Sequence, residues 1–254
     1  MAFLRFLIAT AVLWGLGEYY RRGRTIERAD QWKLWGLGFL AIPLNQGFFL
    51  YGLQWTTTGH SALLYSLTPL LVMLMAAYRL GERVTWGRAT GILVAFSGVM
   101  LVLLERGLQL APGQFTGDLL VLFAVVAWAY YTVAGKPLIR KYGAVVVTAR
   151  AMSYGTVLFL PVGLWSMSDF SASAVSPQAW AGLLYCALIT SVIVYTLWYW
   201  ALHYIDAARV AVFNNIQPVV AALLGWLLLN EPITPVFIAG GLLVVAGVLL
   251  TEML

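Results

Sequence analysis

Nine long apolar runs constrain this chain more than any other feature of its sequence. Most of them are long enough to cross a hydrocarbon core of about 30 Å, which takes roughly 20 helical residues. Within lipid each segment has to satisfy its own backbone hydrogen bonds, so the runs are expected to be helices. The sequence therefore predicts an all-α integral membrane protein with nine transmembrane helices. The runs cover residues 2–17, 34–54, 61–78, 88–104, 117–135, 144–166, 177–201, 206–229 and 235–250.

The composition agrees with this class of protein. Apolar residues make up 62% of the 254 residues and charged residues 10%, whereas soluble domains average about 45–50% and about 25%. Too few polar residues remain to coat a water-soluble globule, which excludes a cytosolic enzyme, a secreted disulfide scaffold and a disordered tail. Cys186 is the only cysteine, so an internal disulfide and a zinc site of several cysteines are excluded as well.

The distribution of basic residues predicts the orientation of the chain. Twelve of the 15 Lys and Arg residues follow alternate runs, with Arg88 and Arg209 counted here although they lie in the first turn of the next run; one follows the other runs, and Arg5 and Arg150 lie within runs. Basic residues gather in cytoplasmic loops, so the segments rich in them, and the C-terminus, are expected in the cytoplasm. The net charge of +5 is therefore interpreted as a sign of orientation, with membrane lipids and a small molecule as expected partners rather than nucleic acid. The twelve are Arg21, Arg22, Arg24, Arg28, Lys33, Arg79, Arg83, Arg88, Lys136, Arg140, Lys141 and Arg209, and the single exception is Arg106.

A shift of the chain by 149 residues aligns several prolines, glutamates, threonines and glycines, which predicts an internal duplication. Pro69 then falls on Pro218, Glu82 on Glu231, Thr85 on Thr234, Gly91 on Gly240 and Gly98 on Gly247. The first repeat covers residues 1–110 with four runs and the second covers 111–254 with five. The two glutamate loops are expected on opposite sides of the membrane, so the repeats are inverted, which requires an odd number of spans in each. The expectation is thus a ten-helix inverted-repeat transporter fold without its first helix, with substrate held near the midplane.

The duplicated motifs resemble a known family. S-L-T-P, L-G-E-R-V-T and G-I-L-V-A-F-S-G-V in the first repeat, with I-Q-P, L-N-E-P-I-T and G-G-L-L-V-V-A-G-V in the second, are similar to EamA-type members of the drug/metabolite transporter superfamily. The resemblance covers nearly the whole chain and implies export or exchange of small metabolites, often amino acids, across a bacterial inner membrane. It implies no cofactor. In that family the first helix, which this chain is expected to lack, helps to line the central cavity.

Polar and aromatic residues at membrane depth are the candidates for substrate binding, because polar groups that face lipid would cost free energy. Two groups precede the repeat prolines, and further candidates lie in the middle of other runs. The alternative interpretation is hydrogen bonding between helices or, for aromatic residues such as Trp55, Trp180, Trp200 and Tyr204, a belt at the membrane interface. The candidates are Asn45, Gln46, Tyr65, Thr68, Trp128, Tyr131, Ser191, Tyr195, Trp198, Asn214 and Gln217, and Ser66 and Asn215 lie among them.

The placement of charges limits the mechanism. No acidic residue lies clearly in the middle of a run; Glu82 and Glu231 are expected to cap helices or order loops, and Arg5 and Arg150 to extend toward the membrane interface. The sequence thus predicts a secondary transporter of small neutral or zwitterionic solutes, with amino acids or related metabolites first among them. A multidrug or cationic amphiphile exporter and a non-transporting scaffold or receptor are the alternatives. No catalytic motif or metal-ligand cluster is present, so the chain is not expected to be an enzyme.

Overall fold

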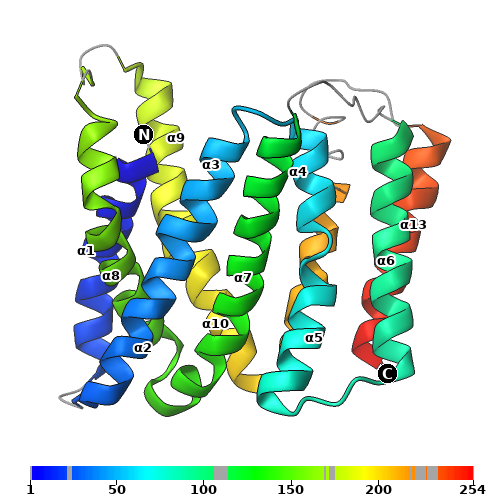
Figure 1. Cartoon of the computed structure of the whole chain (residues 1–254), viewed down its shortest axis with the longest axis horizontal. Coiled ribbons are helices and arrows are strands. Elements are labelled where there is room, and N and C mark those ends of the chain that lie inside the picture. Colours follow the sequence, from blue (N-terminus) through cyan, green and yellow to red (C-terminus); the bar gives the residue numbers. More distant parts are fainter. Residues whose placement is uncertain are drawn as a thin grey trace. The chain divides into compact units, whose positions relative to one another are not determined.

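The computed structural model describes residues 2–21, 25–105, 114–168, 170–171, 175–217, 219–220, 227 and 234–253 (Figure 1). Every regular element within these ranges is a helix, which confirms the all-α class. The elements are α1 (Ala2–Arg21), α2 (Arg28–Phe39), η1 (Leu40–Gly47), α3 (Phe48–Gly52), α4 (Thr58–Tyr65), α5 (Thr68–Leu80), α6 (Trp86–Glu105), α7 (Gln114–Tyr142), α8 (Ala144–Trp165), α9 (Pro177–Tyr185), η3 (Cys186–Val194), α10 (Tyr195–Tyr204), α11 (Ala207–Val212), η4 (Phe213–Ile216) and α13 (Pro235–Met253).

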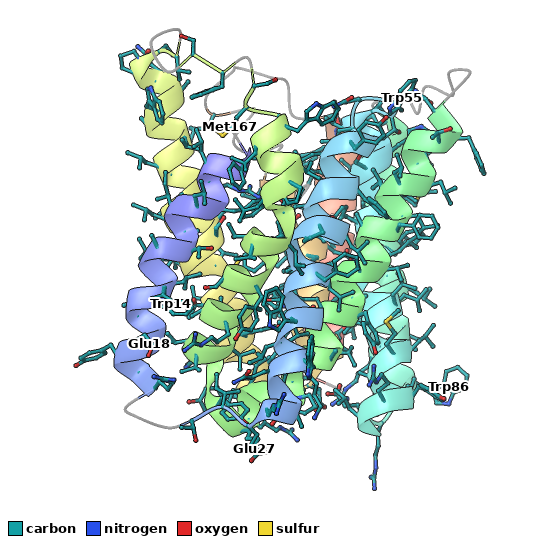
Figure 2. The ribbon with its side chains drawn as sticks, turned by 60° about the vertical axis from the view of Figure 1, so that its left-hand side comes forward. Trp14, Glu18, Glu27, Trp55, Trp86 and Met167 are labelled. Carbon is teal, nitrogen blue, oxygen red and sulfur yellow. The ribbon has the colours of Figure 1, made fainter. Side chains whose placement is uncertain are left out.

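The described helices confirm a multi-pass membrane protein. Seven helical segments are long and apolar enough to span a bilayer, and the apolar part of α6, Trp86–Val102, adds a shorter one. The run 206–229 begins as α11 and η4, and most of the rest of it lies outside the described residues. Figure 2 shows Trp55 and Trp86 near opposite ends of the helices. Their side chains are 52% and 89% exposed, as expected of aromatic residues at the two membrane interfaces.

Three helix starts follow the rules of capping that their sequences suggest, and a fourth does not. Ser176, Thr85 and Thr234 each accept a hydrogen bond from the backbone N–H three residues on, at 3.1–3.2 Å, as their positions before helical runs predict. Asp206 also precedes a helix, but its carboxylate pairs with Arg88 at 2.8 Å and makes no cap of its own.

Glu82 takes over the capping of α11 from a distant part of the chain. The Ala207 N–H at the start of α11 donates to both Glu82 carboxylate oxygens, at 3.0 and 3.2 Å. The expectation that Glu82 caps a helix is therefore confirmed, although the helix is not the one that follows it in the sequence. Its repeat mate, Glu231, lies outside the described residues.

The chain folds into two compact units that each draw on both predicted repeats. Unit 1 comprises Met1–Gln46 and Ala134–Tyr204, and unit 2 comprises Gly47–Val133 and Ile205–Leu254. The predicted repeats, 1–110 and 111–254, describe a duplication of the sequence, whereas the two units describe compact parts of the structure. The division into repeats therefore stays a prediction.

In unit 1, α1 and α8 pack closely along their length. A Cβ atom at Gly17 would lie 2.6 Å from the Ala149 Cβ atom, and one at Gly163 would lie 2.3 Å from the Phe3 ring. Between these contacts the hydroxyl groups of Thr10 and Thr156 are 2.8 Å apart. Small residues thus let two apolar helices come close enough for van der Waals contact and a hydrogen bond, the usual basis of helix association in lipid.

In unit 2, α6 and α13 pack side by side through four glycines (Figure 1). Gly91 lies against the Gly247 carbonyl, and Gly98 lies against the Gly240 carbonyl. Since Gly91 corresponds to Gly240 and Gly98 to Gly247, each contact is the other with the partners exchanged. Such reciprocal contacts are expected across a twofold axis, so the glycine pattern that predicted close packing also supports the inversion of the repeats.

A charged cluster in unit 1 joins the start of α2 to the end of α7. The Asp30 side chain is only 6% exposed and pairs with Lys33 and Lys141, each at 2.7 Å. It also accepts a hydrogen bond from the Tyr142 hydroxyl at 2.8 Å. Lys141 additionally pairs with Glu27 at 2.6 Å, and the Glu27 side chain is 65% exposed.

This difference in burial predicts different effects of removing the two carboxylate charges. Asp30→Asn should lower the midpoint of thermal unfolding by roughly 5 °C or more, because two ammonium groups lose a buried counter-charge. Glu27→Gln, the matched control, should change it by less than about 2 °C, since exposed ion pairs contribute little. Thermal unfolding of the detergent-purified protein measures both, and equal effects of the two variants would contradict the assignment.

Candidate functional site

The two long helices that carry Gln46 and Tyr195 both depart from α-helical geometry. The first contains the π-helical segment η1 (Leu40–Gly47) and the second contains η3 (Cys186–Val194). A shift of 149 residues moves 40–47 onto 189–196, so the two segments overlap. Such π-helical segments occur frequently at functional sites. Pro43 lies inside η1 and was the available sequence signal, whereas nothing comparable marks η3.

In unit 1 the structure brings three predicted candidates together around an arginine. Gln46 donates a hydrogen bond from Nε2 to Asn45 Oδ1 at 2.8 Å and accepts one at Oε1 from Arg5 Nη2 at 2.7 Å. Arg5 also interacts electrostatically with Tyr195. The sequence favours extension of Arg5 toward the membrane interface over a gating or anion-binding role, because it does not show that α1 packs against η3 and that Arg5 reaches Gln46.

The other two candidates of unit 1 have more ordinary surroundings. Ser191 is fully buried and donates a hydrogen bond to the Cys186 carbonyl at 3.2 Å, which suits a structural role within η3. Trp198 is half-buried on α10. Its assignment to the substrate site stays a prediction.

The paired helices of unit 2 also break at equivalent places. α4 and α5 are separated by a turn at Ser66 and Leu67, and α11 is followed by the 3₁₀ segment η4, Phe213–Ile216. A shift of 149 residues moves 66–67 onto 215–216. Both breaks lie just before the repeat prolines, of which Pro69 occupies the first turn of α5 and Pro218 lies outside the described residues.

The predicted residues at these breaks differ in burial. The Tyr65 ring contacts Phe49 edge to face, with centroids 5.4 Å apart, and Thr68 is fully buried. Asn214 is half-buried and Gln217 is exposed. In an α-helix Asn214 and Gln217, three residues apart, would share one face. The 3₁₀ turn changes the phase of the helix, and of the three polar residues 214, 215 and 217 it is Asn215 that is fully buried.

Several buried polar atoms around these breaks have no hydrogen-bond partner in the described part of the chain. They are Thr68 Oγ1, Asn214 Nδ2 and both Nδ2 and Oδ1 of Asn215. A buried polar group without a partner costs about 1–3 kcal/mol, so their retention calls for an explanation. One explanation is that these groups form hydrogen bonds to a solute in one conformation of the protein.

Trp128 and Tyr131 form a second feature of unit 2. Their rings stack on α7 with centroids 5.4 Å apart and planes 23° apart, and Tyr131 is fully buried. The stack is consistent with both the predicted role in substrate binding and ordinary core packing.

His60 pairs with an acidic residue near the start of α7. Its Nδ1 lies 3.0 Å from Asp118 Oδ2, and the Thr56 hydroxyl donates to the other oxygen of Asp118. This cluster joins the turn before α4 to α7 and involves none of the predicted site residues.

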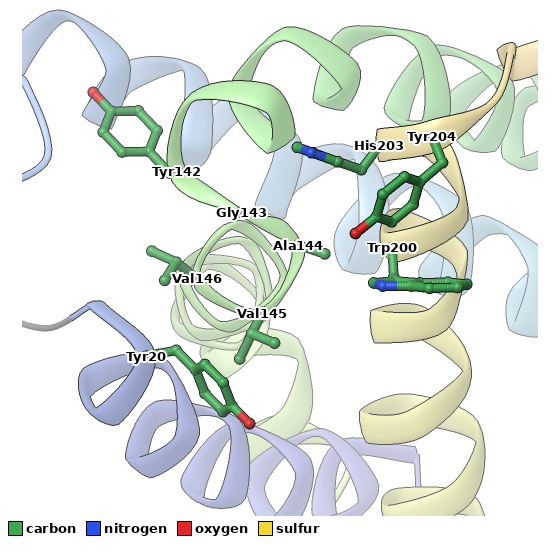
Figure 3. A pocket seen from close by; sticks show the side chains of 9 residues that line it. All are labelled: Tyr20, Tyr142, Gly143, Ala144, Val145, Val146, Trp200, His203 and Tyr204. Atoms are coloured by element: carbon green, nitrogen blue, oxygen red, sulfur yellow. The ribbon is translucent and has the colours of Figure 1, made fainter.

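A cavity of about 270 Å³ lies in unit 1, where α1 and α10 end and α8 begins. Figure 3 shows the polar ends of Tyr20, Trp200 and Tyr204 pointing toward it. Trp200 is 55% exposed and Tyr204 is 68% exposed, which agrees with their predicted place in an interfacial aromatic belt. None of the predicted substrate residues lines this cavity.

Comparison with known proteins identifies the family. The model of the EamA-like transporter family matches residues 1–104 and 115–253. An uncharacterized transporter of Bacillus subtilis, YetK, is 32% identical over 98% of this chain and 76% of its own. A second uncharacterized transporter, from Archaeoglobus fulgidus, is 30% identical over 99% of this chain and 86% of its own.

Two further matches bear on function and fold. A probable terminal-alkyne amino-acid exporter of Streptantibioticus cattleyicolor is 32% identical over 96% of this chain and 79% of its own. A protein of known crystal structure superimposes with a TM-score of 0.84 at 22% identity, over 99% of this chain and 87% of that one, which shows the fold. With its helical membrane architecture, this protein is a membrane transporter rather than an enzyme, and the chain belongs to the EamA-like transporter family.

Proposed function

We propose that the protein is a secondary transporter that exports or exchanges amino acids or related neutral and zwitterionic metabolites. Transport would proceed by alternating access around a polar cavity near the membrane midplane. The protein would lie in the inner membrane of the cell. Its C-terminus would lie in the cytoplasm, as the distribution of basic residues predicts.

The matched helix breaks are the observation that supports this proposal most strongly. η1 and η3 form one pair of equivalent interruptions. The second pair consists of the turn between α4 and α5 and the 3₁₀ segment η4. Interrupted helices at corresponding positions of inverted repeats are typical of substrate sites in secondary transporters. Each pair includes predicted polar residues, with Asn45 and Gln46 in the first and Thr68 and Asn214 in the second.

The choice of amino acids rests on two further points. One relative, 32% identical, is named as a probable exporter of an amino acid. The polar groups at the helix breaks are amides and hydroxyls, and Arg5 of α1 bonds to one of them. Such groups suit the ammonium and carboxylate groups of a small zwitterion by hydrogen bonding.

Uptake of radiolabelled amino acids into proteoliposomes that contain the purified chain tests the proposal. We expect saturable counterflow for at least one member of a panel of the 20 common amino acids. Asn214→Ala should lower that flux more than about tenfold, because the transport step loses a hydrogen-bonding amide at the break. The control, Thr90→Ala, alters an exposed hydroxyl that bonds only to its own helix and should leave flux unchanged. Absence of saturable flux across the panel would contradict the proposed function.

A further inference from the structure

Arg5 is a charged residue in a membrane helix whose guanidinium has no acidic partner in the described part of the chain. Its guanidinium donates a hydrogen bond to Gln46 at 2.7 Å and lies 4.4 Å from the centroid of the Phe6 ring. Its Nε atom is buried and has no hydrogen-bond partner. A charge within a membrane helix is costly and usually marks function.

Arg150 shows what a structural arginine looks like in this fold; it matches Arg5 in the second repeat at an offset of 145 residues, slightly different from the 149 of the other pairs. Arg150 pairs with the Glu18 carboxylate and lies 4.3 Å from the centroid of the Trp14 ring. Figure 2 shows Trp14 and Glu18 on neighbouring turns of α1. Glu18 also pairs with Arg21 at 2.8 Å. Arg150 is thus neutralised within unit 1, whereas its mate Arg5 is not.

The geometry points to Arg5, oriented by Gln46, as the binding site for the carboxylate group of the transported solute. This inference rests on the proposed function and assigns the substrate class more narrowly, to solutes that carry a carboxylate. A guanidinium offers five N–H donors in a planar arrangement that matches a carboxylate. Gln46 Oε1 takes one of them and Asn45 Oδ1 holds the Gln46 amide in turn, so the arginine is oriented while donors remain for a ligand.

Gln46 contributes to this site because it orients the arginine without neutralising it. An amide oxygen accepts a hydrogen bond but brings no negative charge, so the positive charge of Arg5 stays available. The charge-assisted hydrogen bonds that would form with a carboxylate are roughly twice as strong as neutral ones. The site would therefore prefer an amino acid over the corresponding amide of the same size.

The test compares L-leucine with L-leucinamide, and L-phenylalanine with L-phenylalaninamide, by two measurements. One is competition against uptake of the radiolabelled amino acid into proteoliposomes. The other is the ligand-induced shift in the midpoint of thermal unfolding in detergent, which does not require transport. In the unmodified protein we expect the acid to be preferred about 10- to 100-fold over the amide.

Two substitutions remove the free charge in different ways. Arg5→Gln should reduce the preference for the acid to within about threefold, and Arg5→Lys should retain part of it. Gln46→Glu places a carboxylate beside Arg5, as Glu18 lies beside Arg150, so it should abolish the preference without lowering the unfolding midpoint. This variant keeps the test informative if Arg5→Gln folds poorly. Arg150→Gln is the matched control and should lower the unfolding midpoint while the preference for the acid is kept.

The outcomes separate this inference from the proposed function. Saturable flux with an unchanged acid-to-amide ratio in both Arg5→Gln and Gln46→Glu would overturn the role of Arg5 and leave the transporter proposal intact. If no uptake is measurable, the thermal shifts still decide: a larger shift with the acid that disappears in Gln46→Glu supports the inference. Equal shifts with acid and amide, or none with the acid, overturn it.

Discussion

Replacement of Gly247 by alanine is expected to destabilise the protein strongly. A Cβ atom at this position would lie 2.3 Å from the Ala95 backbone nitrogen and 2.5 Å from the Gly91 carbonyl oxygen. Both are backbone atoms of α6, so no side chain can move aside, and the two helices would have to separate. We expect a cost of about 2–4 kcal/mol, toward the upper end of the range for overpacked cores, measured as a lower midpoint of thermal unfolding in detergent.

Gly182 provides the matched control for this substitution. It also lies within an apolar helix, α9, but a Cβ atom there would meet nothing within 4 Å. Because alanine favours the helix by up to about 1 kcal/mol relative to glycine, Gly182→Ala should leave the stability unchanged or raise it. A neutral Gly247→Ala variant would show that α6 and α13 are not held in close contact by their glycines.

The second large effect is expected at Asn215, where stability and transport should change in opposite directions. Its side chain is fully buried, and neither amide atom has a partner in the part of unit 2 that the structure describes. Asn215→Leu removes the unpaired polar atoms and keeps the number and branching of the side-chain heavy atoms, so the midpoint of thermal unfolding should rise. If the amide is kept for solute binding at the break, the same variant should lower amino-acid flux more than about tenfold.

A buried hydroxyl with a partner of its own gives the comparison. Ser153 is buried and donates to the Ala149 carbonyl at 2.7 Å, so Ser153→Ala should lower the stability slightly and leave the flux intact. A stabilised Asn215→Leu variant with full activity would show that this amide has no part in transport.

The sequence was most informative where a single segment decides the outcome. The length and apolar character of the runs predicted helices that cross a membrane, because lipid offers no alternative partner for backbone groups. Ser176, Thr85 and Thr234 can be recognised as caps from the sequence because a cap depends on residues within one turn. The repeated glycines permit close packing because they carry no side chain.

The sequence was less informative where a residue's partner lies far along the chain. Asp206 precedes a helix as a cap should, but Arg88 attracts its carboxylate and Glu82 takes its place, and these contacts span more than a hundred residues of sequence. The π-helical segment η3 was also not predictable from the sequence, since it contains no proline that would mark it.

The sequence by itself determined the class of protein, its duplicated pattern and the set of polar residues that a transport site could use. Only the tertiary structure decided which of those residues are buried, paired or unpaired. It placed Asn215 rather than Gln217 inside and set Arg5 beside Gln46. The reason is physical: backbone hydrogen bonding and hydrophobicity act along one segment, whereas the state of a charge or an amide depends on what the neighbouring helices bring to it.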